Sequence, residues 1–182
     1  MEMTERPISY SFGQRLKTLY SPQFLVIFPV YCLVLIPLAS VFAYLGTLMD
    51  KYLGLTFPVP PMISYIIAGI FILAGFILLW YSYSFLILEG GGGPVPPFSH
   101  KTKILVTIGP YALVRHPIYS GLILAAFGVG LVVHGWLTLA YALTLLLFFD
   151  IKSRREERWL SGKFSGYDAY RKRVRKLIPW LY

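Results

Sequence analysis

The sequence of 182 residues is poor in cysteine, in histidine and in charge. It has one cysteine, Cys32, and three histidines. An internal disulfide is therefore impossible, and no metal site is expected from so few thiols and imidazoles. Charged residues make up 14% of the chain and hydrophobic residues 57%, and the mean hydropathy is +0.64. This composition excludes a disordered chain and is too apolar for an ordinary soluble domain, so we expect a membrane-embedded protein.

Acidic residues are also scarce relative to basic ones. Eight Asp and Glu stand against 17 Lys and Arg, which gives a net charge of +9. In a soluble protein this imbalance would suggest nucleic acid as a partner. In a membrane protein an excess of Lys and Arg instead marks loops on the cytoplasmic side. We therefore expect the lipid bilayer, and no nucleic acid, as a partner of this chain.

Long apolar runs predict about four membrane-spanning helices. A spanning helix needs roughly 20 residues to cross a hydrocarbon core about 30 Å thick. Charge-free runs that approach or exceed this length cover residues 22–49, 62–88, 118–133 and 136–149. Because only His134 and Gly135 separate the last two runs, these runs predict a helical hairpin whose arms extend past the lipid. The fold class is therefore all-α and integral to the membrane.

The distribution of charge predicts the orientation of these helices. Lys and Arg outnumber Asp and Glu in residues 1–20, in residues 89–116 and in the tail from residue 150, whereas residues 50–51 and 134–135 form charge-balanced or uncharged loops. With an even number of spans, the N-terminus, the middle loop and the C-terminus all face the cytoplasm. No internal repeat is visible, so residues 1–182 are interpreted as one domain. Its first two helices lie in residues 1–88, and the middle loop, hairpin and tail lie in residues 89–182.

The start of the third apolar run has the pattern of a ligand site. Proline suits the first position of a helix and disfavours helical geometry in the residue before it, so Pro117 should begin a helix with His116 outside it. Arg115 and His116 then lie at the positive end of that helix. Unpaired backbone N–H groups and a guanidinium at one place favour a carboxylate or phosphate from a ligand.

The hairpin also predicts what lies opposite this corner. If both arms are continuous helices, residues whose numbers sum to roughly 269 lie at the same height. Glu156 is then level with Leu113, and Lys152 is level with Pro117. We therefore expect the charged extension of the last helix to complete a site with Arg115 and His116. The alternative is a solvated basic flank in which ion pairs are weak.

The C-terminal tail has its own periodic pattern. Apolar and aromatic residues recur there at spacings of three, four and three, at Tyr167, Tyr170, Val174 and Leu177. Basic residues fill most of the positions between them, which predicts an amphipathic cytoplasmic helix. Such a helix could lie on anionic lipid headgroups or close over the site as a lid. Trp180 and Tyr182 are residue types that suit the membrane interface.

These segments together resemble a known family. Residues 115–119 read Arg-His-Pro-Ile-Tyr before the hairpin, and Glu156 and Glu157 follow it, with Phe164 and Tyr167 beyond. This combination is similar to the isoprenylcysteine carboxyl methyltransferase and phospholipid methyltransferase superfamily of integral membrane enzymes. The resemblance covers roughly residues 89–182. It implies that S-adenosylmethionine binds at the cytoplasmic ends of the last two membrane helices.

The resemblance also implies roles for individual residues. The cofactor would be bound by Lys103, Ile104, Leu105, Val106, Tyr111, His116, Pro117, Ile118, Tyr119 and Glu156. The catalytic residues would be Arg115 and Glu156, and the substrate would meet Lys152 and Arg155. Methyl transfer depends chiefly on positioning and exclusion of water, so neither a metal nor a covalent nucleophile is required.

The expected methyl acceptor is lipid-like or prenylated, because its tail can come from the membrane while the soluble cofactor comes from the cytoplasm. Gly121, Ala125 and Gly128 form a small-residue stripe that suits close helix packing, or else a lipid groove.

Two other functions remain open. One is an NADPH-dependent sterol-type reductase with similar C-terminal helices, and the other is a non-enzymatic scaffold whose basic tail binds anionic lipid. The sequence carries no signal of oligomeric state.

Overall fold

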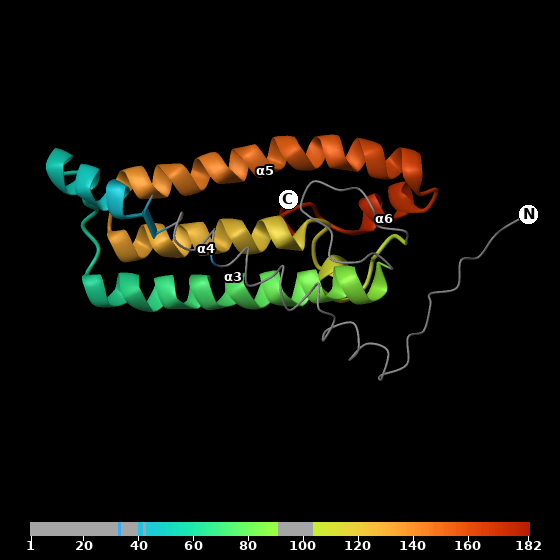
Figure 1. Cartoon of the computed structure of the whole chain (residues 1–182), viewed down its shortest axis with the longest axis horizontal. Coiled ribbons are helices and arrows are strands. Elements are labelled where there is room, and N and C mark those ends of the chain that lie inside the picture. Colours follow the sequence, from blue (N-terminus) through green and yellow to red (C-terminus); the bar gives the residue numbers. More distant parts are fainter. Residues whose placement is uncertain (1–32, 34–39, 42, 91–103) are drawn as a thin grey trace, which may run out of the picture.

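Long helices packed side by side make up most of the described chain (Figure 1). The computed structural model describes residues 33, 40–41, 43–90 and 104–182. After a helical segment at residues 43–53, the elements are α3 (Pro61–Glu89), the short 3-10 helix η1 (Gly109–Ala112), α4 (Pro117–Val133), α5 (Trp136–Lys163) and α6 (Tyr167–Arg173). Within these ranges there is no β-strand, and the only extended pairings are two isolated bridges. The predicted all-α class is confirmed for this part of the chain.

Helix α4 lies between α3 and α5 and contacts both (Figure 1). Its contact with α3 is close because glycines face each other across it. A Cβ added to Gly121 would lie 2.8 Å from the Gly75 carbonyl oxygen, and one added to Gly128 would lie 3.0 Å from the Ala68 carbonyl oxygen. The small-residue stripe therefore serves helix packing, as one of its two interpretations predicted, and forms no lipid groove.

The turn between α4 and α5 occurs at the two predicted residues. His134 has the left-handed φ of 58° that ends α4, and Gly135 precedes α5. The carboxylate of Asp50 accepts hydrogen bonds from the backbone N–H of Leu137 at 3.0 Å and from the hydroxyl of Thr138 at 3.2 Å. It thereby satisfies donors that the first turn of a helix leaves free. A Cβ on Gly135 would clash with this carboxylate, so a larger residue there would displace the Asp50 side chain.

The prediction that residues 50–51 form a loop is wrong. Both residues lie in the helical segment 43–53, and Asp50 is buried, with 1% of its surface exposed. The physical reason is the contact described above, because the Asp50 carboxylate binds the beginning of α5. The charge-balanced pair Asp50 and Lys51 therefore belongs to a packed helix and not to a loop. The predicted first span, residues 22–49, lies mostly outside the described residues.

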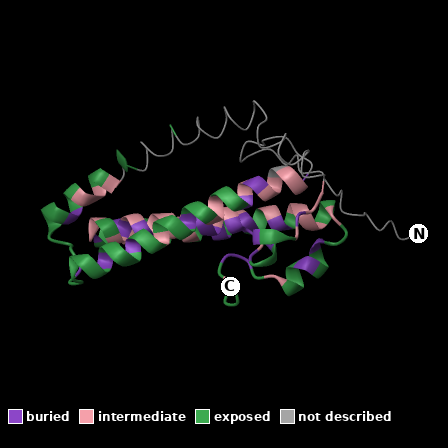
Figure 2. Ribbon diagram, turned by 90° about the horizontal axis from the view of Figure 1, so that it is seen from below, coloured by how far each residue is buried: buried purple, intermediate pink, exposed green. Residues whose placement is uncertain are grey.

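Two helices, α3 over Pro61–Leu86 and α5 over Trp136–Lys163, are long and apolar enough to cross a membrane, and α4 is apolar but shorter. Only 17% of the most apolar part of α3 is buried within the molecule. A core helix of a soluble protein would be mostly buried, whereas α3 leaves Ile66, Ile70 and Leu73 exposed. Figure 2 shows such exposed residues along the outer faces of the bundle. These faces are suited to contact with lipid.

The C-terminal tail is helical over a shorter length than predicted. Helix α6 ends at Arg173, and Val174 has the extended φ and ψ of −113° and 136°. The backbone N–H groups of Arg115 and His116 donate to the carbonyl oxygens of Arg175 and Lys176 at 2.8 and 3.1 Å. Residues 174–182, here called the strap, therefore pair with the segment before α4 instead of continuing the helix.

Candidate functional site

The first turn of α4 has the geometry predicted from its proline. His116 is the residue before the helix, with φ of −123° and ψ of 62°, and Pro117 occupies the first turn. Ser120 donates its backbone N–H to the His116 carbonyl oxygen, which closes that turn. The side chains of Arg115 and His116 thus leave the helix end and lie beside α5.

A buried ion pair joins this corner to α5. The Arg115 Nε donates to Oε1 of Glu157 at 2.9 Å, and the His116 Nε2 lies 3.1 Å from the same oxygen. The Arg115 Nη1 also donates to the carbonyl oxygens of Arg171 and Val174, at 3.0 and 2.5 Å. The side chains of Arg115 and Glu157 are only 10% and 5% exposed. Because charges so far from water need full pairing, this arginine fixes four segments relative to one another.

Glu156, the neighbouring carboxylate, is more open and lies at the end of an aromatic stack. It accepts a hydrogen bond from the Tyr119 hydroxyl at 2.7 Å, and its side chain is 34% exposed. The Tyr119 ring is stacked between His116, at 5.4 Å, and Phe149, at 4.7 Å between ring centroids. The Lys152 ammonium lies 5.1 Å from the centre of the Tyr119 ring. The Tyr119 ring therefore already lies within cation–π distance of a side-chain ammonium.

Tyrosines from η1 and α6 close the other side of the corner. The Tyr170 hydroxyl donates to the Tyr111 carbonyl oxygen at 2.6 Å. Burial, followed by the nearby Tyr170 and Glu156, raises the pKa of Tyr111 far above its usual range. Burial likewise raises the pKa of Tyr167 and Tyr170. These phenols consequently stay neutral near physiological pH and keep their hydroxyl protons for donation.

A second polar cluster holds the strap against α5, and sequence reasoning missed it. The carboxylate of Asp150 accepts from the Lys176 ammonium at 2.5 Å and from the Tyr182 hydroxyl at 2.8 Å. The Arg154 guanidinium lies 2.7 Å from the other Asp150 oxygen. The available signal was an acidic residue directly after the last apolar run.

Most of the residues expected in the site are brought together at this end of the bundle. Those near the corner are Tyr111, Arg115, His116, Pro117, Tyr119, Lys152 and Glu156, and Ile118 is half-buried in the first turn of α4. Val106 is buried, and the Ile104 N–H donates to the Gly90 carbonyl oxygen at 3.3 Å, so residues 104–106, including Leu105, pass the end of α3.

Two of the expected residues differ from this group, and Glu157, which was expected beside the corner without a role of its own, contacts Arg115 directly. Lys103 lies outside the described residues, and Arg155 is exposed on α5. Glu157, not Glu156, is the partner of Arg115. The pair of adjacent glutamates in the sequence was the only signal for this residue, and their order along the helix did not reveal which one turns inward.

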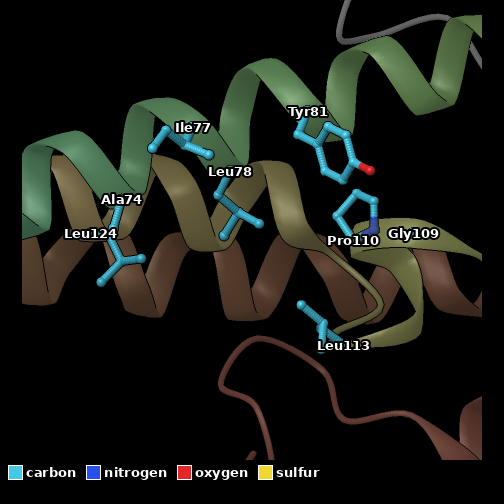
Figure 3. A pocket seen from close by; sticks show the side chains of 8 residues that line it. All are labelled: Ala74, Ile77, Leu78, Tyr81, Gly109, Pro110, Leu113 and Leu124. Carbon is cyan, nitrogen blue, oxygen red and sulfur yellow. The ribbon is translucent and has the colours of Figure 1, made fainter.

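An apolar groove of about 690 Å³ lies next to the corner, between α3 and the η1–α4 segment. Figure 3 shows its lining side chains, which are Ala74, Ile77, Leu78, Tyr81, Gly109, Pro110, Leu113 and Leu124. Gly109 has the left-handed φ of 62°, and a Cβ there would meet the Phe85 ring at 2.5 Å, so glycine allows η1 to approach α3. Because Pro110 directly precedes Tyr111, the groove and the polar corner share one short segment.

Comparison with known proteins agrees with the resemblance to the methyltransferase superfamily. The sequence pattern of the phospholipid methyltransferase family matches residues 63–166. The protein-S-isoprenylcysteine O-methyltransferase of Schizosaccharomyces pombe is 39% identical over 82 residues, which are 44% of this chain and 35% of that protein. The cobalt-zinc-cadmium resistance protein CzcN of Cupriavidus metallidurans is 34% identical over 82 residues, 44% of this chain and 38% of that protein.

A third relative carries the name of a different methyl acceptor. Methanethiol S-methyltransferase 1 of Bradyrhizobium diazoefficiens is 38% identical over 90 residues, which are 49% of this chain and 29% of that protein. The chain thus matches well under half the length of each of these three relatives. The resemblance seen in the sequence is therefore confirmed for the phospholipid methyltransferase family.

Proposed function

Because the chain belongs to the phospholipid methyltransferase family, we propose that it is an integral membrane methyltransferase that uses S-adenosylmethionine. Its acceptor is lipid-like or prenylated. Four helices span the bilayer in this proposal, with both termini and the site at the cytoplasmic face. The supporting observation is the contact of Arg115 and His116 with Glu157, because it joins the start of α4 to the extension of α5 beside the open carboxylate of Glu156.

The residues at the corner fit the chemical groups of S-adenosylmethionine. When bound, the cofactor supplies an electrophilic methyl group on a sulfonium. Glu156 uses one carboxylate oxygen for Tyr119 and is a third exposed, so it can pair with the cofactor's amino group or accept from its ribose hydroxyls. The Lys152 ammonium near the Tyr119 ring shows that this ring can attract a cation, and in this proposal the sulfonium takes the place of that ammonium beside the ring. Residues 104–106, Tyr111 and the His116–Ile118 segment form the rest of the proposed cofactor wall.

Arg115 acts in this proposal by holding the site in shape. Its guanidinium is used by Glu157 and by the carbonyl oxygens of Arg171 and Val174, so it keeps α6 and the strap over the first turn of α4. Such positioning, with exclusion of water, is the main protein contribution to an in-line displacement. We therefore assign Arg115 a positioning role and Glu156 direct contact with the cofactor.

The apolar groove provides a place for the acceptor's tail. It is lined by α3 and α4 side chains, of which Ile77 and Tyr81 are exposed, and it reaches Pro110, beside Tyr111. A tail in this groove would leave its polar head near the corner, where Lys152 and Arg155 could meet an anionic group. The family match favours neither the reductase nor the scaffold alternative.

Calorimetry with S-adenosylhomocysteine tests the proposal. The detergent-purified protein should bind this product, and Glu156→Ala should weaken binding by roughly tenfold, which is ~1.4 kcal/mol. Arg158→Ala, an exposed residue one position beyond the glutamate pair, is the matched control and should leave binding unchanged. Equal affinities of the wild type and Glu156→Ala would overturn the site. Binding of NADPH without binding of S-adenosylhomocysteine would replace the proposal with the reductase.

A methyl-transfer assay identifies the acceptor class. Radiolabelled S-adenosylmethionine is supplied with a total lipid extract, and label should enter the organic phase with the wild type and not with Glu156→Ala. Label that stays in the aqueous phase, despite binding of the cofactor, would reject a lipid-like acceptor.

A further inference from the structure

The last six residues of the strap form an apolar loop that is exposed except at Leu177, which packs in the hydrophobic core. Residues 177–182 contain no charged side chain, and the exposed fractions of Trp180 and Leu181 are 87% and 76%. Ile178 and Tyr182 are also exposed. Figure 2 shows the C-terminal end as a loop beside the bundle of α3, α4 and α5. Adjacent large apolar side chains facing outward are a feature of interaction sites.

The conformation of this loop is fixed by its own hydrogen bonds. The backbone N–H groups of Leu177 and Ile178 both donate to the Tyr182 carbonyl oxygen at 2.8 Å. Trp180 has a left-handed φ of 60°, an unfavourable conformation for a bulky residue. The turn thus holds the indole away from the protein at a conformational cost, which suggests that the indole meets a partner outside it.

Two contacts set the height of the loop along the bundle. The Ser120 hydroxyl, in the first turn of α4, donates to the Leu177 carbonyl oxygen at 2.6 Å. The Tyr182 hydroxyl donates to Asp150, the residue that directly follows the apolar part of α5. The loop therefore lies where α4 begins and where α5 changes from apolar to charged. In a hairpin that spans the bilayer, this height is the boundary between acyl chains and headgroups.

We propose that residues 177–182 are a membrane-interface anchor, in which Trp180 and Leu181 insert into the headgroup layer of the leaflet next to the site. The proposal rests on the spanning hairpin of the proposed function. Tryptophan is enriched at this depth because its ring is apolar while its N–H can donate to headgroups. The Arg154 guanidinium, 65% exposed and bound to Asp150, lies at the same height and contacts anionic headgroups.

Lipid quenching of single tryptophans tests the anchor. The chain has four tryptophans, and replacing three with phenylalanine leaves only Trp180 or, as the control, only Trp136 at the other end of α5. In vesicles of phosphatidylcholine and phosphatidylglycerol, Trp180 should be quenched more by lipids brominated near the headgroup than by lipids brominated at the chain end. Aqueous iodide should quench it little.

Trp136 separates failure of the anchor from failure of the membrane arrangement. Quenching of Trp180 by iodide and not by brominated lipid, while Trp136 is quenched by lipid, would overturn the anchor alone. Absence of lipid quenching at both positions would overturn the spanning hairpin as well. If a triple variant does not fold, the difference in emission between the wild type and Trp180→Phe reports the same residue.

The role of Arg154 is tested in the same vesicles. Arg154→Gln should reduce lipid quenching of Trp180 when phosphatidylglycerol is present and leave it unchanged in phosphatidylcholine alone. Arg158→Gln, one helical turn further along α5, is the matched control and should have no effect. Equal quenching in Arg154→Gln and the wild type with phosphatidylglycerol would overturn the headgroup contact.

Discussion

Asp50 and Glu157 are buried carboxylates at opposite ends of the α4–α5 hairpin, and their partners differ. Asp50, at the turn end, accepts from a backbone N–H and a hydroxyl, which are neutral groups at the beginning of α5. Glu157, at the open end, lies within ion-pair distance of Arg115, His116 and Arg171. The turn end therefore uses a carboxylate to complete a helix. The open end concentrates charge beside the partly exposed Glu156, which suits the proposed cofactor site.

The largest expected effect comes from removing the carboxylate at the open end. Glu157→Ala leaves Arg115 charged, buried and without its main partner, so the free energy of unfolding should fall by about 3–5 kcal/mol. Chemical denaturation in detergent, followed by tryptophan fluorescence, measures the change. The adjacent Glu156→Ala is the control and should cost below about 1 kcal/mol, because its side chain is partly exposed. Similar losses in the two variants would contradict the assignment of Glu157 as the buried partner.

A smaller effect is expected at the turn end. Asp50→Ala removes the acceptor for the Leu137 N–H and the Thr138 hydroxyl, so the free energy of unfolding should fall by about 1–2 kcal/mol. The affinity for S-adenosylhomocysteine, measured in the folded fraction, should stay that of the wild type. A loss of affinity comparable to that of Glu156→Ala would show that the two ends of the hairpin do not act separately.

The smallest expected effect concerns one hydrogen bond that supports the open end. Tyr170→Phe removes the bond to the Tyr111 carbonyl oxygen, so the free energy of unfolding should fall by about 1 kcal/mol. Because Tyr111 is in the proposed cofactor wall, binding of S-adenosylhomocysteine should weaken slightly. Tyr52→Phe changes a tyrosine that is 86% exposed and should alter neither quantity. A stability loss without any change in binding would remove Tyr111 from the wall.

The hairpin and its corner could be predicted from the sequence because they follow from local rules. Pro117 fixes where α4 begins, and the two residues at the turn fix where it ends. The predicted height of Glu156 along the hairpin was less accurate. The residue numbers placed Glu156 level with Leu113, whereas it accepts a hydrogen bond from Tyr119. Side chains on a helix tilt toward its N-terminus. In antiparallel arms, Tyr119 therefore reaches toward the open end and Glu156 toward the turn, so they meet between their backbone levels.

Long-range contacts account for what the sequence did not reveal. The spacing of Val174 and Leu177 suited a helix, but pairing of the strap with Arg115 and His116 gives an extended backbone. The burial of Asp50 depends on contact with α5, more than 80 residues later in the chain. Neither contact leaves a periodic signal, because each joins one short segment to another that is distant in sequence.

The separation of 59 residues between Arg115 and its acceptor Val174 has a consequence for biosynthesis. Ribosomes deliver the chain from its N-terminus, so the α3, α4 and α5 helices are all synthesised before the strap emerges. Until α6 and the strap emerge, Arg115 lacks its acceptors at Arg171 and Val174, and the corner is incomplete. The contacts of Arg115 with these carbonyl oxygens therefore form only after both arms of the α4–α5 hairpin have been synthesised.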